Sequence, residues 1–366
     1  METYNNKLDR SSSLDLIRII AAFSVFIPHY IAIQYNNVLF NNFYLKIIPI
    51  IGVEIFFSLS GFLICSQALK IINNDDKIKQ NFFIYIIRRI MRTWPLYIFG
   101  LLCYILYYKY YDINVLYYFL FLQNMFQPII SDDFFSVSWS LVVEEYFYLL
   151  YPLIFIVFYY IFRIKIINLN KNFLIFLSCI FMIIIFSYIR SVADINLNNW
   201  GKEIRRVGMF RLDSIAFGGL AAFLYPYLKN KKYFSLIYFF IFVVSLLLIF
   251  DILNNYLLTK SFYNNNFGKN LIFFLFMICG SSLIYIFKAN FEIYNLKIKK
   301  NISIISDLSY PLYIFHILII DLTKNIFSNN LWLNFIFTST ILLIFCYILR
   351  KFIEIPILSK RPNFYH

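Results

Sequence analysis

Arg18 and His29 lie in the first long apolar segment of the chain, Leu14–Ile33, which has about the 20 residues that a membrane-spanning helix needs. A guanidinium inside such a segment is costly and needs a physical reason. Their spacing places both side chains on one helix face, about 16 Å apart along the axis. A cation near one membrane surface and a deeper imidazole suit a reactant that lies along this face. The alternative is an arginine that extends to the interface and a histidine buried in the core.

Other charged or imidazole side chains stand inside or at the ends of apolar segments. Such residues mark interior polar sites, or they join helices through hydrogen bonds. Taken together they favour a polar site inside a helix bundle. These residues are Glu54, Glu144, Glu145, Arg211, Asp213 and His316. Trp139 precedes the two adjacent glutamates in the same segment.

Arg88, Arg89 and Arg92 form a basic cluster, because residues three and four apart are neighbours on a helix surface. Guanidinium groups match phosphate oxygens, so the cluster predicts a site for a phosphorylated cofactor. The alternatives are a topology signal or a contact with anionic lipid. The preceding run, Phe82–Ile90, is interpreted as amphipathic and interfacial, and Pro95 permits a kink that turns the next helix away.

The composition indicates a polytopic membrane protein of the all-α class. The 366 residues are 61% hydrophobic and 14% charged, with a mean hydropathy of +0.71. The five cysteines stand singly without metal-ligand spacing, so no metal site is expected. The net charge of +14 is interpreted as a topology signal, because no basic segment has the context of a nucleic-acid binder.

Hydropathy predicts one membrane domain, residues 1–366, of about ten spans. Ser12 with Asp15 predicts a capping box at the start of the first span. Val115–Leu122 is too short to cross and is expected to be re-entrant or interfacial. The predicted spans are Leu14–Ile33, Ile47–Leu69, Trp94–Tyr108, Leu141–Phe162, Phe173–Ile189, Val207–Leu228, Tyr233–Phe250, Leu271–Phe287, Ile302–Ile320 and Leu331–Leu349.

Most Lys and Arg residues fall on one side of this arrangement, which predicts that the N- and C-termini are both cytoplasmic. One outer stretch departs from the pattern and is interpreted either as a solvated loop or as a site for anionic material such as a lipid-linked phosphate. Its basic residues are Arg190, Lys202, Arg205, Arg206 and Arg211.

In their order along the chain, these segments resemble the acyltransferase-3 superfamily of integral membrane acyltransferases, from Leu14 to about Pro356. Each motif is weak alone, and their order makes the resemblance specific. The matching residues are Leu14-Asp15, Arg18-x10-His29, Gly52-Val-Glu54 with Ser58-Leu-Ser-Gly61, Arg89-x-x-Arg92 with Trp94-Pro-Leu-Tyr97, Trp139-Ser-Leu with Val143-Glu-Glu-Tyr-Phe-Tyr148, Arg211-Leu-Asp213, Ser309-Tyr310 with Tyr313 and His316, and Glu354 before Pro356.

The resemblance implies transfer of an acyl group, usually acetyl from cytoplasmic acetyl-CoA, to a sugar hydroxyl of a surface or exported glycan such as an O-antigen or capsule. Its Arg-x10-His and Arg-x-x-Arg motifs, which are tied to activity in the family, fall on Arg18, His29, Arg89 and Arg92. It further implies a multi-pass protein of the bacterial inner membrane. The expected partners are acyl-CoA, a glycan or lipid-linked saccharide, and membrane lipid. The esterase domain that some members carry, of the SGNH type, is not present in this chain.

We therefore expect Arg89 and Arg92, with Arg88, to hold the phosphates of CoA, and Arg18 to assist. His29 is the predicted base, acting directly on the sugar hydroxyl or by first accepting the acyl group. Glu144 is the candidate for orienting His29 or a substrate hydroxyl. The residues assigned to substrate contact are Glu54, Trp139, Arg211 and His316.

Two other readings remain at this point. A transporter or flippase of lipid-linked sugars also uses intramembrane charges, although no inverted repeat or pair of broken helices is visible. A different membrane O-acyltransferase family also uses an intramembrane histidine, but that residue lies deep in its chain, whereas His29 lies in the first span.

Overall fold

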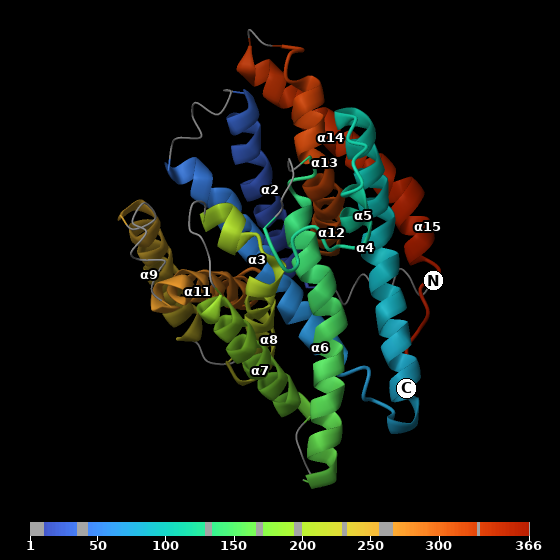
Figure 1. The fold of residues 1–366 in the computed structure, drawn as a ribbon, viewed down its shortest axis with the longest axis vertical. Helices are drawn as coiled ribbons and strands as arrows, with labels where there is room; N and C mark the ends of the chain where they lie inside the picture. Colours follow the sequence, from blue (N-terminus) through green and yellow to red (C-terminus); the bar gives the residue numbers. More distant parts are fainter. Residues whose placement is uncertain are drawn as a thin grey trace. The chain divides into compact units, whose positions relative to one another are not determined.

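The structure, a computed structural model, describes residues 11–34, 43–128, 134–165, 171–193, 200–228, 233–255, 266–327 and 330–365. These residues form helices and connecting turns, and no strand occurs among them (Figure 1). The α-helices are α2 (Ser12–Gln34), α3 (Phe43–Ala68), α4 (Ile78–Tyr108), α5 (Val115–Phe119), α6 (Ser138–Lys165), α7 (Lys171–Val192), α8 (Leu212–Leu228), α9 (Phe234–Asn255), α11 (Asn266–Asn290), α12 (Leu296–Asp307), α13 (Ser309–Thr323), α14 (Leu331–Leu349) and α15 (Ile355–Leu358).

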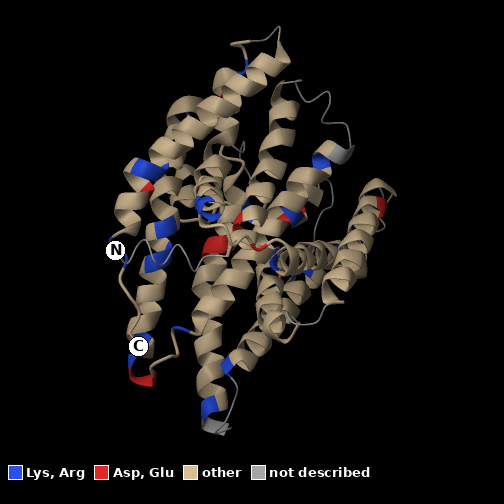
Figure 2. Ribbon diagram, turned by 180° about the vertical axis from the view of Figure 1, so that it is seen from behind, with Lys and Arg blue, Asp and Glu red and all other residues tan. Residues whose placement is uncertain are grey.

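Every predicted span corresponds to a helix in the described part of the chain. Among the described residues, eight helices are long and apolar enough to cross a membrane, and the pair α12–α13, bent by 46° at a short break, raises the number to nine if it is one span. The remaining predicted span is α8, which has 17 residues. Figure 2 shows that charged residues are sparse along these helices. The prediction of an all-α polytopic membrane bundle is confirmed.

Helix α4 joins the third predicted span to the run that precedes it. Helix α4 runs from Ile78 to Tyr108 without interruption, with Pro95 inside it. A proline removes one backbone hydrogen bond, and membrane helices tolerate this loss when neighbouring groups satisfy the freed carbonyl. Consequently Arg88, Arg89 and Arg92 stand on the spanning helix itself, not on a separate interfacial segment.

The chain divides into two compact units, each assembled from separate stretches of sequence. The first unit consists of residues 1–56, 90–110 and 290–361, and in it α2 packs against α12 and α13 while α13 packs against α14. The second unit consists of residues 57–89, 111–289 and 362–366, and in it α7 packs against α6 and α8 (Figure 1).

The start of α2 is capped by Glu292, and the predicted capping box of Ser12 and Asp15 is wrong. The Glu292 carboxylate accepts hydrogen bonds from the hydroxyls of Ser11 and Ser13 and from the backbone and hydroxyl of Ser12, at 2.8–3.1 Å. Asp15 instead turns toward Arg18 and Ser306. A carboxylate at a helix N-terminus satisfies N–H groups and interacts favourably with the helix dipole.

This cap makes stability depend on pH in a direction that can be tested. Burial raises the pKa of Glu292, but the hydrogen bonds from Ser13, Ser11 and Ser12 together lower it below its ordinary value of 4.5. A carboxyl with a lowered pKa in the folded state stabilises the fold above its unfolded value and loses that contribution as the pH falls through the folded value.

We therefore expect Glu292→Gln to destabilise the protein by about 1 kcal/mol at pH 7, as loss of a helix cap does. As the pH falls through the lowered folded-state pKa, the variant and the parent protein should converge, because the parent carboxyl becomes protonated. Thermal unfolding in detergent between pH 3.5 and 7 measures both effects. The control is Asp251→Asn, which alters an exposed carboxylate on α9. An equal loss at every pH would contradict this account.

In the second unit, glycines bring α3 and α8 into backbone contact. A Cβ placed on Gly61 would lie 1.8 Å from the carbonyl oxygen of Ile215, and one on Gly218 would lie 2.1 Å from that of Ser58. Small residues at helix interfaces permit such close approach in membranes. This explains why Gly61 follows Ser58 in the motif of the second span.

We expect Gly61→Ala and Gly218→Ala each to destabilise the fold by about 1–3 kcal/mol, the range for overpacking a tight contact. Gly52→Ala is the comparison, because its added methyl first meets the hydroxyl of Ser24, which can rotate away. Thermal unfolding in detergent should rank the Gly52 variant as the mildest. Equal losses in all three variants would show that the backbone contact is not the cause.

Candidate functional site

Arg18 is held near the start of α2 by a polar triangle in the first unit. Its Nη1 donates to Asp15 Oδ1 at 3.0 Å and to Ser306 Oγ at 3.1 Å, and Ser306 Oγ donates to Asp15 Oδ1 at 2.9 Å. The Arg18 side chain is 12% exposed and that of Asp15 is 2% exposed. The guanidinium is therefore fixed between α2 and α12 and partly neutralised, with some of its surface accessible.

His29 lies eleven residues further along α2 and is half-buried. Its Nδ1 is 2.8 Å from the carbonyl oxygen of Val25. A carbonyl only accepts hydrogen bonds, so Nδ1 carries the hydrogen and the neutral ring keeps its basic lone pair on Nε2. His29 therefore has the form that a general base requires.

His316 stands beside His29 in the same unit. The two ring centroids are 5.1 Å apart, and His316 Nε2 is 3.4 Å from His29 Nδ1. His316 is fully buried on α13, which packs along α2. The sequence assigned His316 to substrate contact, and the structure places it in contact with the predicted base.

Glu54 is 2% exposed and belongs to the first-unit part of α3. Two residues earlier, Gly52 lies against Ser24 and Val25 of α2, the turn that precedes His29. The close approach at Gly52 thus brings the Glu54 segment of α3 against the helix that carries Arg18 and His29.

Arg92 stands in a second group of charges within the first unit. Its charge, together with those of Arg350 and Arg361, acts on the half-buried carboxylate of Glu354. Arg350 also donates to Asp307 Oδ2 at 2.7 Å. Arg350 and Glu354 bound a π-helical turn after α14, and π-turns of this kind occur frequently at functional sites.

Arg89 stands between two tyrosine rings in the second unit. Its guanidinium is 5.2 Å from the ring centre of Tyr148 and 5.6 Å from that of Tyr85, and it donates to Gln67 Oε1. Tyr148 donates to Glu144 Oε2 at 2.7 Å, and Ser60 donates to Glu144 Oε1 at 3.0 Å. Glu144 therefore supports the tyrosine against which Arg89 rests.

Arg88 is engaged by the C-terminal segment of the chain. Its Nη1 donates to the carbonyl oxygen of Pro362 at 2.6 Å, and its guanidinium lies 5.4 Å from the ring centre of Phe364. Asn81, two turns earlier on α4, exchanges two hydrogen bonds with the backbone of Tyr365. The structure thus places Arg88, which the sequence grouped with Arg89 and Arg92, in contact with this tail.

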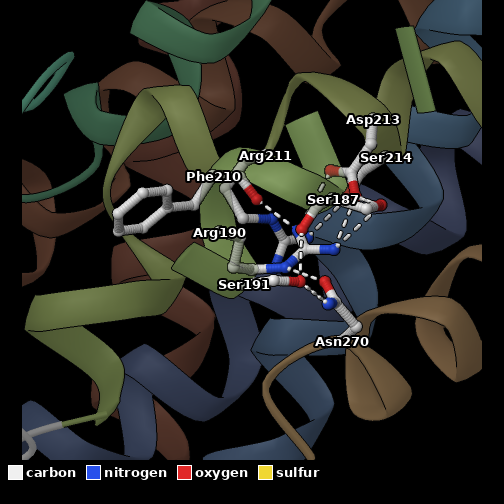
Figure 3. Close-up of polar contacts among 8 residues, drawn as sticks. All are labelled: Ser187, Arg190, Ser191, Phe210, Arg211, Asp213, Ser214 and Asn270. Carbon is white, nitrogen blue, oxygen red and sulfur yellow. Dashed lines mark hydrogen bonds and ion pairs between the residues drawn. The ribbon is translucent and has the colours of Figure 1, made fainter. Parts of the chain in front are cut away.

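The interpretation of the outer basic stretch as a solvated loop is wrong for Arg190 and Arg211, which are fully buried in the second unit (Figure 3). Arg190 Nη2 donates to Asp213 Oδ2 at 2.7 Å, and its Nε donates to Asn270 Oδ1 at 2.8 Å. Figure 3 shows these groups gathered around the Arg190 guanidinium. Sequence reasoning missed the pair because the two residues stand on different helices, α7 and α8.

Trp139 and Arg211, both predicted to contact substrate, are packed against aromatic rings of the same unit. The Arg211 guanidinium lies 4.2 Å from the ring centre of Phe273 and 5.8 Å from that of Phe57. The Trp139 and Phe57 rings pack edge to face with their centres 5.9 Å apart. The Arg205 guanidinium lies 4.8 Å from the Trp139 ring centre. Cations and aromatic faces thus alternate through this core.

The predicted site residues are divided between the two units. Arg18, His29, Glu54, Arg92 and His316 belong to the first, and Arg88, Arg89, Trp139, Glu144 and Arg211 belong to the second. Among the described residues, no three His, Cys, Asp or Glu side chains are grouped so as to hold a metal ion. The chemistry available in the first unit is that of an imidazole with a basic Nε2 on a helix that also carries a cation.

Comparison with known proteins identifies the family. A family model described as an acyltransferase domain, that of the acyltransferase-3 family, matches residues 11–351. No curated protein and no solved structure gives a significant match. The match extends from the start of α2 into the π-helical turn after α14 and so includes both units. The chain therefore belongs to the acyltransferase-3 superfamily of membrane acyltransferases.

Proposed function

We propose that this membrane acyltransferase transfers an acetyl group from cytoplasmic acetyl-CoA to a hydroxyl of a glycan or lipid-linked saccharide. The observation that carries the proposal is the 2.8 Å contact between Nδ1 of the half-buried His29 and the Val25 carbonyl. Because a carbonyl only accepts, we infer that Nδ1 carries the hydrogen and that Nε2 is basic. The arginine of the family motif, Arg18, lies on the same helix. Family membership favours this activity over transport of lipid-linked sugars.

The proposed reaction begins when Nε2 of His29 removes the proton of the sugar hydroxyl as its oxygen attacks the thioester carbonyl. The tetrahedral intermediate then collapses, the carbon–sulfur bond breaks, and the CoA sulfur leaves with the proton returned by the imidazolium. A direct transfer needs no covalent enzyme intermediate. Hydrogen-bond donors aimed at the developing oxyanion complete such a site.

For the acyl donor, we assign Arg89 and Arg92 to the phosphates of CoA, with Arg18 as a further cation. Arg89 and Arg92 are three residues apart on α4 and so share one side of the helix. Glu144, through Tyr148, is assigned to positioning Arg89. Arg88 is removed from the donor site because the tail holds it. No metal takes part in this proposal.

We expect Arg89→Lys to raise the KM for acetyl-CoA about tenfold, the effect of losing roughly 1.4 kcal/mol of uniform binding. Lysine cannot reproduce the planar, bidentate recognition of phosphate. Arg88→Lys is the matched control, because Arg88 bonds the tail and should leave this KM unchanged. Initial rates at varied acetyl-CoA test both variants, and a larger effect at Arg88 would contradict the assignment.

Two measurements test the proposed function as a whole. Inside-out membrane vesicles that contain the protein are supplied with labelled acetyl-CoA, and label is followed into glycan. In parallel, mass spectrometry compares surface glycans of cells with and without the gene, and an added acetyl mass identifies the modified sugar. Absence of both signals would reject acetyl transfer to a glycan.

A separate experiment tests the topology. Introduced cysteines are labelled from the outer or the inner side of the inner membrane, and we expect both termini to be labelled from the cytoplasmic side.

A further inference from the structure

The buried histidine of α13 is in position to act on the proposed base. Nδ1 of His316 lies 2.8 Å from the carbonyl oxygen of Tyr313 and 3.2 Å from that of Leu312. Its Nε2 lies 3.4 Å from Nδ1 of His29. These contacts connect one turn of α13 to the imidazole of α2 within the first unit.

The positions of the hydrogens follow from the partners. Because both carbonyls can only accept, His316 Nδ1 carries a hydrogen, and the neutral ring has its lone pair on Nε2. His29 Nδ1 also carries a hydrogen, which it donates to Val25. The facing atoms are therefore a donor on His29 and an acceptor on His316, and the His29 hydrogen is shared between the Val25 carbonyl and His316 Nε2.

We infer that His316 is a positioning residue for His29: its Nε2 holds the Nδ1–H of His29 and so keeps Nε2 of His29 basic and aimed for proton transfer. In many acyl-transfer sites the attacking hydroxyl and its base are accompanied by a third group, which orients the base. Here the third group is a neutral imidazole. The catalytic part of this inference rests on the proposed function, whereas the arrangement of hydrogens does not.

The arrangement also accounts for the step in which His29 becomes charged. When Nε2 takes the hydroxyl proton, the positive charge spreads over the ring, and Nδ1–H becomes a stronger donor to Val25 and His316. The proton stays on His29, because passing it on would place the charge on a ring that is fully buried. His316 thus stabilises the imidazolium without accepting the proton.

Packing alone is the competing explanation of this contact. The rings are inclined by 48°, and the Tyr313 ring lies 6.0 Å from His316, so His316 also fills space among aromatic residues. Packing and hydrogen bonding can be separated by two substitutions of His316 of similar size, one that keeps a hydrogen-bond acceptor and one that removes it. In His316→Gln the side-chain amide oxygen can occupy the position of Nε2, whereas His316→Leu fills the volume without an acceptor.

The first test reads the hydrogens directly and needs no activity. The chain has only three histidines, so protein labelled with ¹⁵N-histidine gives three imidazole signals that single substitutions assign. We expect His29 and His316 both to show a protonated Nδ1 and an unprotonated Nε2. His316→Leu should shift the His29 Nδ1 signal, and His316→Gln should largely restore it. A protonated Nε2 on His316, or a His29 signal that His316→Leu leaves unchanged, would overturn the inference.

The second test uses acetyl transfer by the full-length protein at matched abundance. We expect His316→Leu to lower kcat about 10- to 100-fold, less than loss of the base itself, with the KM for acetyl-CoA within twofold of the parent. His316→Gln should recover most of kcat. Equal losses in the two variants would show that His316 acts only through packing. If the parent protein transfers no acetyl group while the expected ¹⁵N signals are present, the proposed function fails and the arrangement of hydrogens stands.

Discussion

Replacement of His29 by glutamine is expected to reduce kcat for acetyl transfer by about 10²- to 10⁴-fold, the usual contribution of a general base. Glutamine has a similar length and can still donate a hydrogen bond, but its amide nitrogen and oxygen do not accept a proton at neutral pH. The loss should appear in kcat, and the KM for acetyl-CoA should stay near the parent value, because His29 acts on the hydroxyl and not on the donor phosphates.

Labelled acetyl-CoA supplied to inside-out vesicles measures this effect, with protein abundance matched by quantitative blotting. Ser24→Ala is the control on the same helix, because the Ser24 hydroxyl bonds the backbone carbonyl of Ala21, about two turns before His29. It should retain the parent rate. Undiminished transfer by His29→Gln at normal abundance would rule out His29 as the base.

The second large effect is expected at the buried ion pair of the second unit. Arg190→Met or Asp213→Leu alone should destabilise the protein by about 3–5 kcal/mol, because each leaves an uncompensated charge in a dry interior. Both side chains are 0% exposed, so water cannot replace the lost partner. The double variant Arg190→Met/Asp213→Leu should recover much of this loss, since neither charge then remains. Recovery should be incomplete, because the Asn270 amide oxygen also loses its donor.

Thermal unfolding and the fraction of aggregated protein in detergent provide the measurement for all three variants. The matched control is the exposed ion pair of Arg163 with Asp75, whose side chains are 51% and 41% exposed. Arg163→Met should cost no more than about 1 kcal/mol, as surface pairs do. A double variant no more stable than the less stable of its two single variants would contradict a desolvation origin for the effect.

Hydropathy was sufficient to predict where the long apolar helices of this protein lie, because a span needs a long apolar run and little else. It failed where local signals conflict. Arg88 to Arg92 and Pro95 mark a boundary in sequence, yet α4 continues through them. The cap of α2 was also unpredictable, because Glu292 comes from a distant segment and reaches the helix only after folding.

In the candidate site, too, features within one helix could be predicted from the sequence, whereas contacts between distant helices could not. Periodicity was enough to place Arg18 and His29 on one face of α2. It provided no means of pairing His29 with His316, since that contact depends on how α13 packs against α2. The burial of Arg190 was missed for a related reason: a charged residue in a connecting segment looks solvated until its carboxylate partner on another helix is known.

The contact between His29 and His316 also has a consequence for biosynthesis, because its partners are 287 residues apart in the chain. At the usual rate of about 5–20 residues per second, a ribosome needs roughly 15–60 s to make the intervening segment. Helix α2 is therefore synthesised long before α13 exists, and His29 meets His316 only near the end of translation. The same delay holds for the Glu292 cap of α2, 280 residues from Ser12, and for the tail on α4, 284 residues from Asn81. Under the role proposed for His316, nascent chains released early would carry His29 but lack the residue that orients it.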